Sequence, residues 1–185
     1  MLTEVEKKQL LEIAREAIRS ALEGTSLPEI ETDSPALEKP GAAFVTLRKH
    51  GELRGCIGTI EPRSPLYRVV QNMAVQAASA DYRFEPVTPG ELDNLSIEIS
   101  VLSPPEPLTT PEEIIIGTHG LIIEKSWTRG LLLPQVASER GWTAVEFLEN
   151  VCLKAGLPPS AWKDPDTKLW KFTATVFSED EMEDG

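Results

Sequence analysis

Apolar residues recur every three or four positions in three stretches of the chain, and this period predicts three helices. The first covers residues 5–22 and follows Thr3 and Glu6, which have the spacing of a helix-capping box. The second covers residues 66–80, directly after a Ser-Pro pair that is typical of a helix start. The third covers residues 143–155 and again begins with a capping-box pair.

A period of two predicts the strands. Residues 95–101 alternate most clearly between apolar and polar side chains. Residues 43–59 read as a β-hairpin around a His-Gly turn, and residues 119–125 and 130–134 read as a second hairpin. Residues 169–177 form a last strand. Tightly joined strands that alternate with single helices favour an α+β fold, with a mainly antiparallel β-sheet flanked by helices, over a doubly wound parallel sheet.

Three segments have neither period. Residues 25–42 contain three prolines and few apolar anchors, so we expect a surface loop that forms an edge segment or a lid. Residues 111–115 resemble a short helix. Residues 178–185 are acidic, and we expect them to be a disordered tail after one domain that spans residues 1–177.

The stretch of residues 53–59 combines a cation, a thiol and two glycines in one predicted strand. With a two-residue turn, Cys56 lies opposite Val45, and Arg54 shares a face with Cys56 because side chains alternate along a strand. A nearby guanidinium stabilises a thiolate, so Cys56 is a candidate catalytic nucleophile and Arg54 a candidate anion ligand. A shift of one residue in the register would move Cys56 to the opposite face.

Gly55 and Gly58 flank this cysteine. Glycine weakens a strand unless another group approaches the backbone closely or a bulge is required, so both are candidate ligand contacts. The alternative is structural: glycines also mark plain bulges, and a free cysteine is usually a small buried hydrophobe.

A short polar loop, Asp81-Tyr82-Arg83-Phe84, directly follows the second predicted helix. Loops of this composition often line a cleft, which makes Asp81, Arg83 and Phe84 candidate ligand-binding residues. Alternatively, Asp81 and Arg83 pair with each other. Glu98 is the one charge within residues 95–101, and it is a further candidate ligand-binding residue. It is either solvated or the partner of Arg54.

His119 is a second, weaker catalytic candidate. An imidazole can act as the base for a thiol, and His50 belongs to a turn, so His119 is the better base for Cys56. A histidine directly before a strand is nevertheless ordinary, and no third residue is marked to orient it.

Composition narrows the functional classes. The net charge of −12 argues against a generic nucleic-acid-binding protein, which needs clustered Lys and Arg. The two cysteines have no metal-ligand spacing, and we expect neither a metal nor a cofactor. Cys152 lies on the apolar stripe of the third helix and should be inert core. No signal-peptide pattern and no apolar run near roughly 18 residues is present, so we expect a cytoplasmic protein without a membrane span.

The run Leu53-Arg54-Gly55-Cys56-Ile57-Gly58 resembles the signature of the AMMECR family. One departure is Tyr82, where bacterial and archaeal members often have proline. Further patches similar to the family occur in its order along most of the chain: residues 81–87, 97–103, 120–124, 130–136 and 154–158, with Trp162.

The resemblance implies a domain with a larger and a smaller lobe, in a family whose biochemical activity is not settled. It also implies a pathway shared with a Memo-type protein and a radical-SAM protein, because members are often encoded beside or fused with them. We therefore expect a small-molecule cleft near Arg54, Cys56, the Asp81 loop and Gln135 with the preceding Pro134. The rival hypothesis is a non-catalytic adaptor, in which the same patches dock a Memo-type or radical-SAM partner.

Overall fold

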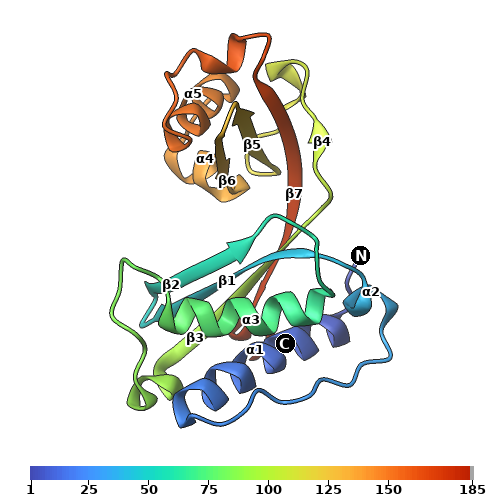
Figure 1. Ribbon diagram of the computed structural model, residues 1–185, viewed down its shortest axis with the longest axis vertical. Coiled ribbons are helices and arrows are strands. Elements are labelled where there is room, and N and C mark those ends of the chain that lie inside the picture. The colour runs from blue at the N-terminus through green and yellow to red at the C-terminus, as the bar shows by residue number, and fades with distance from the viewer. Residues whose placement is uncertain (184–185) are drawn as a thin grey trace. The chain divides into compact units, whose positions relative to one another are not determined.

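The computed structural model describes the backbone of residues 1–183, and its fold is α+β (Figure 1). The chain divides into two compact units. Unit 1, the larger, comprises Met1–Val101 together with the residues from Thr175 onward, and unit 2 comprises Leu102–Ala174. The long strand β7 (Lys168–Ser178) begins in unit 2 and ends in unit 1. Each unit has a hydrophobic core of its own.

Unit 1 is built from a sheet and two long helices. The strand order is β2-β1-β3-β7, in which β1 (Ala42–Lys49) and β2 (Glu52–Thr59) pair antiparallel and β3 is Leu95–Leu102. Helix α3 (Leu66–Ser79) packs on β1 and β2, and α1 (Glu4–Glu23) packs on α3 (Figure 1). Fully buried aliphatic side chains fill the interior between these layers, among them Leu10, Ile18, Val45, Leu47, Val70, Ile97 and Ile99.

Local sequence signals account for the boundaries of these elements. Thr3 and Glu6 form the predicted capping box: the Thr3 amide donates to Glu6 at 2.7 Å and the Glu6 amide donates to Thr3 Oγ1 at 3.2 Å. The β1–β2 turn has two residues, His50 and Gly51, with φ of 52° and 79°. Both lie in the left-handed region, as the tight turn of a twisted hairpin requires.

The two predicted loops of unit 1 contain short helices. Residues 25–42 include α2 (Pro35–Glu38), which Leu37 anchors in the core. The loop between α3 and β3 ends in a 3₁₀ turn, η1 (Pro89–Asn94). The acidic segment predicted to be a disordered tail instead folds at residues 179–183 into helix α6 (Glu179–Glu183), and the last two residues lie outside the described part. The reason is a long-range ion pair of Glu179, described below.

Unit 2 contains the second hairpin. Strands β5 (His119–Lys125) and β6 (Thr128–Leu132) pair antiparallel, and β5 also pairs antiparallel with β7. The short strand β4 (Glu106–Pro107) pairs with β7 as well, which gives the order β4-β7-β5-β6. The hairpin turn has two residues rather than the predicted four, because Ser126 takes a positive φ of 54°.

The helices of unit 2 are α4 (Pro134–Arg140) and α5 (Ala144–Lys154), with 3₁₀ turns η2 (Pro111–Glu113) and η3 (Ala161–Lys163). Helix α5 carries the predicted capping box and was expected from its apolar stripe. Helix α4 was missed by the sequence reading, which extended the preceding strand into it. The unit's core is formed largely by fully buried residues of β5 and α5: Leu121, Ile123, Phe147, Leu148, Val151 and Cys152.

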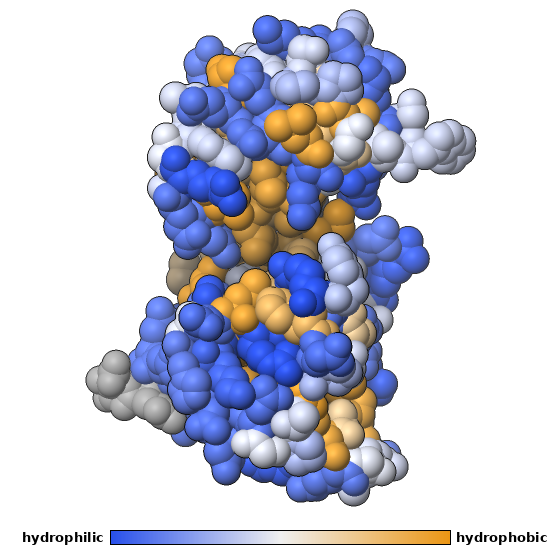
Figure 2. Space-filling view, turned by 90° about the vertical axis from the view of Figure 1, so that its left-hand side faces the viewer, coloured by the Kyte–Doolittle hydropathy of each residue, from blue (hydrophilic) through white to orange (hydrophobic). Residues whose placement is uncertain are grey.

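Hydrophilic residues cover much of the face drawn in Figure 2, in keeping with the net charge of −12. Among the helices in residues 1–183, none is long and apolar enough to cross a membrane.

Candidate functional site

A β-bulge in β2 determines where Cys56 lies. The predicted register holds at the turn, but Gly55 pairs with Leu47, so Arg54 is an extra residue without a partner on β1. Beyond this bulge every side chain of β2 changes face, as an inserted residue requires. Cys56 therefore lies opposite Thr46 rather than opposite Val45, and Ile57 packs against the core instead.

The two glycines of the motif are explained by packing within the protein. A Cβ atom on Gly55 would lie 2.2 Å from the carbonyl oxygen of Ala77 in α3. A Cβ atom on Gly58 would lie 2.3 Å from a ring carbon of Phe44, its cross-strand partner. The group that approaches each backbone closely is thus a helix or an aromatic ring of unit 1, and no ligand is needed to account for either glycine.

Asp81 connects the polar loop to β2. Its carboxylate accepts hydrogen bonds from the Cys56 amide at 2.9 Å, from the Arg83 amide at 3.1 Å, and from Arg83 Nε and Nη2 at 3.0 and 2.7 Å. The Asp81 side chain is only 3% exposed. The Arg83 guanidinium, helped by the two amides, holds the pKa of Asp81 far below its usual range, and Asp81 raises the pKa of Arg83. The pairing of Asp81 with Arg83, an alternative at the sequence level, is present.

Arg54 forms hydrogen bonds to Glu91 and to the backbone of Glu85. Its Nε and Nη2 atoms donate to Glu91 at 3.1 and 3.2 Å, and Nη1 donates to the Glu85 carbonyl at 2.8 Å. Lys49 also donates to Glu91, at 2.9 Å. Arg54 is the main cause that lowers the pKa of Glu91 far below its usual range. The sequence reading missed Glu91, although its capping-box spacing from Thr88 was a usable signal.

Glu98 is not the partner of Arg54. It lies on β3, and β1 separates that strand from β2. The cation nearest to Glu98 is Arg48 of β1, with Nη2 3.9 Å from Oε1. Arg54 pairs with Glu91 instead, so the alternative that made Glu98 its partner is wrong.

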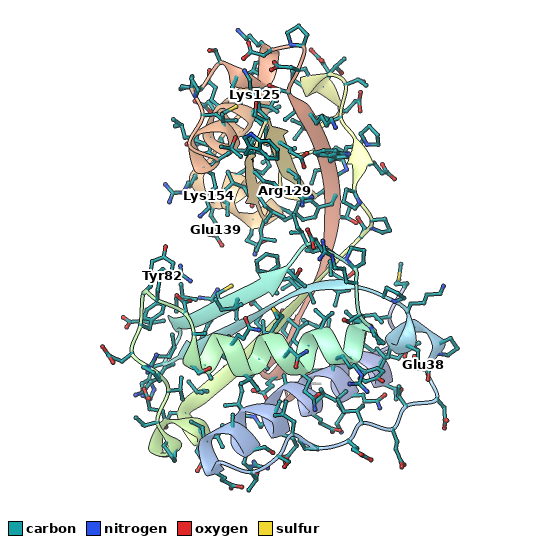
Figure 3. The ribbon with its side chains drawn as sticks, viewed as in Figure 1. Glu38, Tyr82, Lys125, Arg129, Glu139 and Lys154 are labelled. Atoms are coloured by element: carbon teal, nitrogen blue, oxygen red, sulfur yellow. The ribbon has the colours of Figure 1, made fainter. Side chains whose placement is uncertain are left out.

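These contacts hold a loop whose outer residues face solvent. Tyr82 is 95% exposed, and Figure 3 shows it pointing away from the helices and strands of unit 1. Arg83 is 44% exposed, and its guanidinium carbon lies 5.4 Å from the centre of the half-buried Phe84 ring. The loop therefore exposes Tyr82 and Arg83, while Asp81 and Arg54 fix the loop to β2.

The two thiols differ in their surroundings. Cys56 is half-buried, and its Sγ accepts a hydrogen bond from Thr46 Oγ1 at 3.3 Å. The guanidinium expected to stabilise a thiolate there is paired with Glu91 instead. Cys152 is fully buried, and burial raises the pKa of its thiol. The expectation that Cys152 is a core residue is confirmed, and its inertness stays a prediction.

The remaining candidates belong to unit 2. His119 opens β5, and its Nδ1 accepts the Ile115 amide at 3.0 Å. Pro134 is the buried first residue of α4, and Gln135 follows it, half-buried. The structure brings Arg54, Cys56 and the Asp81 loop together within unit 1, whereas the pairing of Cys56 with His119 stays a prediction.

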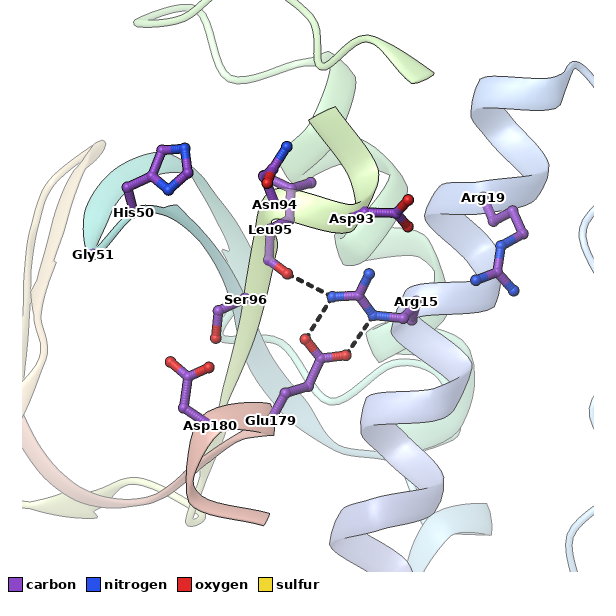
Figure 4. A pocket seen from close by; sticks show the side chains of 10 residues that line it. All are labelled: Arg15, Arg19, His50, Gly51, Asp93, Asn94, Leu95, Ser96, Glu179 and Asp180. Atoms are coloured by element: carbon purple, nitrogen blue, oxygen red, sulfur yellow. Dashed lines mark hydrogen bonds and ion pairs between the residues drawn. The ribbon is translucent and has the colours of Figure 1, made fainter. Parts of the chain in front are cut away.

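A polar cavity of about 550 Å³ in unit 1 was not expected from the sequence (Figure 4). At its wall Arg15 of α1 donates from Nε and Nη2 to Glu179 at 2.6 and 2.7 Å, and from Nη2 to the Leu95 carbonyl at 2.6 Å. Glu179 also accepts the Ile97 amide at 2.9 Å. These contacts dock α6, and no local sequence signal could join residues so far apart in the chain.

Comparison with known proteins gives the family. The AMMECR1 family model matches residues 11–177. A protein from Methanothermobacter thermautotrophicus is 48% identical over 182 residues, which cover 95% of each chain. A protein from Aquifex aeolicus is 44% identical over 181 residues, 94% of this chain and 93% of its own. The crystal structure of an uncharacterized protein from Pyrococcus horikoshii superposes with a TM-score of 0.86 at 44% identity, covering 92% of this chain and 89% of that one. The chain therefore belongs to the AMMECR1 family.

Proposed function

We propose that this protein is a cytoplasmic adaptor that binds a partner protein through the loop of residues 81–86. The observation that carries the proposal is the exposure of Tyr82 on a loop anchored by the buried Asp81 carboxylate and by Arg54. Tyrosine and arginine are enriched among the residues that dominate interface energetics. An anchored loop also loses little conformational freedom on binding, which favours affinity.

The chemistry of the loop defines the partner surface that would fit it. Tyr82 would enter an apolar pocket whose rim offers a hydrogen-bond acceptor for the phenol. Arg83 would face a carboxylate, although it already donates to Asp81 and has only its remaining N–H groups to offer. The candidates are the Memo-type and radical-SAM proteins that the family resemblance implies.

A binding measurement with the full chain and a purified Memo-type or radical-SAM protein tests this proposal. We expect Tyr82→Ala to weaken binding by about tenfold or more, as for a central interface aromatic. Cys56→Ser should bind like the unmodified protein. Trp127→Ala is the matched control, since Trp127 is an equally exposed aromatic at a turn of unit 2. Loss of binding in the Trp127 or Cys56 variant, with Tyr82→Ala unaffected, would overturn the proposal.

A second candidate function is thiol chemistry on a small-molecule substrate at Cys56. It is supported by the free, half-buried Sγ and its hydrogen bond from Thr46. Alkylation of the folded protein, followed by peptide mass spectrometry, tests it with Cys152 as the internal control. Rapid modification of Cys56 alone would support this function. Protection of both cysteines until the protein unfolds would exclude it.

A further inference from the structure

A second, smaller cavity lies within unit 2, apart from the surface discussed above. Its volume is about 240 Å³, and residues of β4, β5 and β7 line it. Glu106, His119 and Lys171 contribute the titratable groups, and the exposed Pro104 and Pro105 contribute apolar surface. Ser103 and Thr173 form part of the wall and are joined by two hydrogen bonds. The Ser103 amide donates to the Thr173 carbonyl at 2.8 Å, and Ser103 Oγ accepts the Thr173 amide at 2.8 Å.

Lys171 is unusual among the charged residues of the described chain. Its side chain is only 18% exposed, yet its ammonium makes no hydrogen bond to any residue within 1–183. Among residues 1–183 its ionic contact is with Glu113, whose Oε2 lies 3.6 Å from Lys171 Nζ. A lysine ammonium has three N–H donors, and on a mostly buried side chain it normally satisfies them, because desolvation without hydrogen bonds is costly. Lys171 therefore has donors to offer to a group inside the cavity.

His119 provides a second donor at the same cavity. Its Nδ1 accepts the Ile115 amide at 3.0 Å, so the neutral ring carries its proton on Nε2. Burial, followed by the charge of Lys171, lowers the pKa of His119, which favours this neutral, donating form. Within residues 1–183 the Glu113 carbonyl also hydrogen-bonds the ring and raises the pKa of His119.

We infer that this cavity binds the carboxylate of a small organic acid, with Lys171 as the cation and His119 Nε2–H as the second donor. Two N–H donors that line one cavity select a ligand group that only accepts hydrogen bonds. The two prolines would contact a short aliphatic chain on the ligand. The cavity is smaller than the roughly 300–1,000 Å³ of drug-sized sites, which limits the ligand to a few carbon atoms.

The surrounding charges favour a carboxylate over a phosphate. Glu113 lies beside Lys171, and Glu106 lines the same cavity. While His119 is neutral, the cavity therefore has one cation and two carboxylates nearby. A dianion would meet more repulsion there than a monoanion. Protonation of His119, which faces Lys171 and Glu106, adds a cation. Affinity for the carboxylate should therefore rise as the pH falls through the His119 titration, and bound carboxylate should raise the pKa of His119.

Nuclear magnetic resonance titrations of the full chain with sodium acetate and sodium butyrate test this inference, with sodium chloride at equal ionic strength as the control. We expect saturable shifts at the His119 ring and at residues 171–173, with dissociation constants on the order of 1–10 mM. Butyrate should bind more tightly than acetate because of the apolar wall. In the unmodified protein, saturating butyrate should raise the pKa of His119.

Lys171→Met retains the apolar stem and removes the charge, and it should weaken butyrate binding by about tenfold or more. Lys168→Met is the matched control, since Lys168 is an exposed lysine on the same strand that does not line the cavity, and it should bind normally. Shifts no larger than those with chloride, a His119 pKa that butyrate leaves unchanged, or full affinity in Lys171→Met would each overturn the inference. The pKa measurement needs no variant, so the test holds even if Lys171→Met does not fold.

Discussion

Asp81 joins the polar loop to the edge strand of unit 1 through a single carboxylate. It accepts the Cys56 amide, which would otherwise be unpaired on the edge strand β2, and it also fixes the Arg83 guanidinium. Both ends of the Asp81–Arg83 pair are stabilised in their charged forms. At the residue scale, the family signature thus attaches the 81–86 loop to strand β2.

Replacement of Asp81 by Asn removes this charge with little change of shape. We expect a loss of about 2 kcal/mol at neutral pH, below the value for a fully buried ion pair because Arg83 is partly exposed. The pKa of Asp81 is depressed in the folded state, so its contribution is complete above the usual value of about 3.9 and is lost as the pH falls toward the folded value. Urea unfolding at several pH values measures it, with the exposed Asp33→Asn as control. A difference between the variant and the unmodified protein that already vanishes near neutral pH would contradict this assignment.

Gly55→Ala tests the packing explanation of the motif glycines. The new Cβ would collide with the Ala77 carbonyl, a backbone atom that cannot move without shifting α3. We expect a loss of about 1–3 kcal/mol in the free energy of unfolding. Gly90→Ala is the matched control, because no atom lies within 4 Å of its Cβ position. Equal stability of the two variants would refute the close approach of α3 to β2.

At the scale of elements, the sequence predicted the three longest helices and every strand except the two-residue β4, because their boundaries are marked by local signals. The Thr3 capping box and the His50-Gly51 turn are examples. The prediction failed where long-range contacts decide the structure. The bulge at Arg54 depends on Glu91 and the Glu85 carbonyl, which no local pattern reveals, and it reversed the face assigned to Cys56.

Only part of the candidate site was predicted, because long-range contacts determine the rest. The clustering of Asp81 with Arg83 was anticipated as an alternative because the two residues are close in sequence. The bond from the Cys56 amide to Asp81 could not be foreseen, because it depends on how α3 lies on β2. His119, Pro134 and Gln135 proved to belong to unit 2, a division of the chain that composition and periodicity do not mark.

Helix α6 provides a test at this scale. Glu179→Gln removes the charge that pairs with Arg15, and both side chains are less than one-quarter exposed. We expect a loss of about 2 kcal/mol in unfolding free energy and faster hydrogen exchange of the Ile97 amide, which donates to Glu179. Glu181→Gln, at an exposed position of the same helix, should change neither quantity. Unchanged stability and exchange in Glu179→Gln would instead fit the disordered tail expected from composition.

At the scale of the whole molecule, charge limits the class of partner. A net charge of −12 opposes attraction to phosphate backbones, and acidic residues are spread over both units. We predict no binding to single-stranded RNA or duplex DNA at about 0.15 M salt. Fluorescence polarisation with labelled oligonucleotides measures this. Binding that weakens steeply with added salt would contradict the prediction and would point to a local cluster of basic side chains.

Amide hydrogen exchange at Cys56 shows whether the family signature holds the 81–86 loop on β2. We expect this amide to be protected in the unmodified protein, although it lies on an edge strand, because it donates to Asp81. Asp81→Ala removes the acceptor and should abolish the protection, while the amide of the buried Val45 on β1 remains protected. If the Cys56 amide exchanges at the unprotected rate in the unmodified protein, the loop has no fixed attachment to the strand.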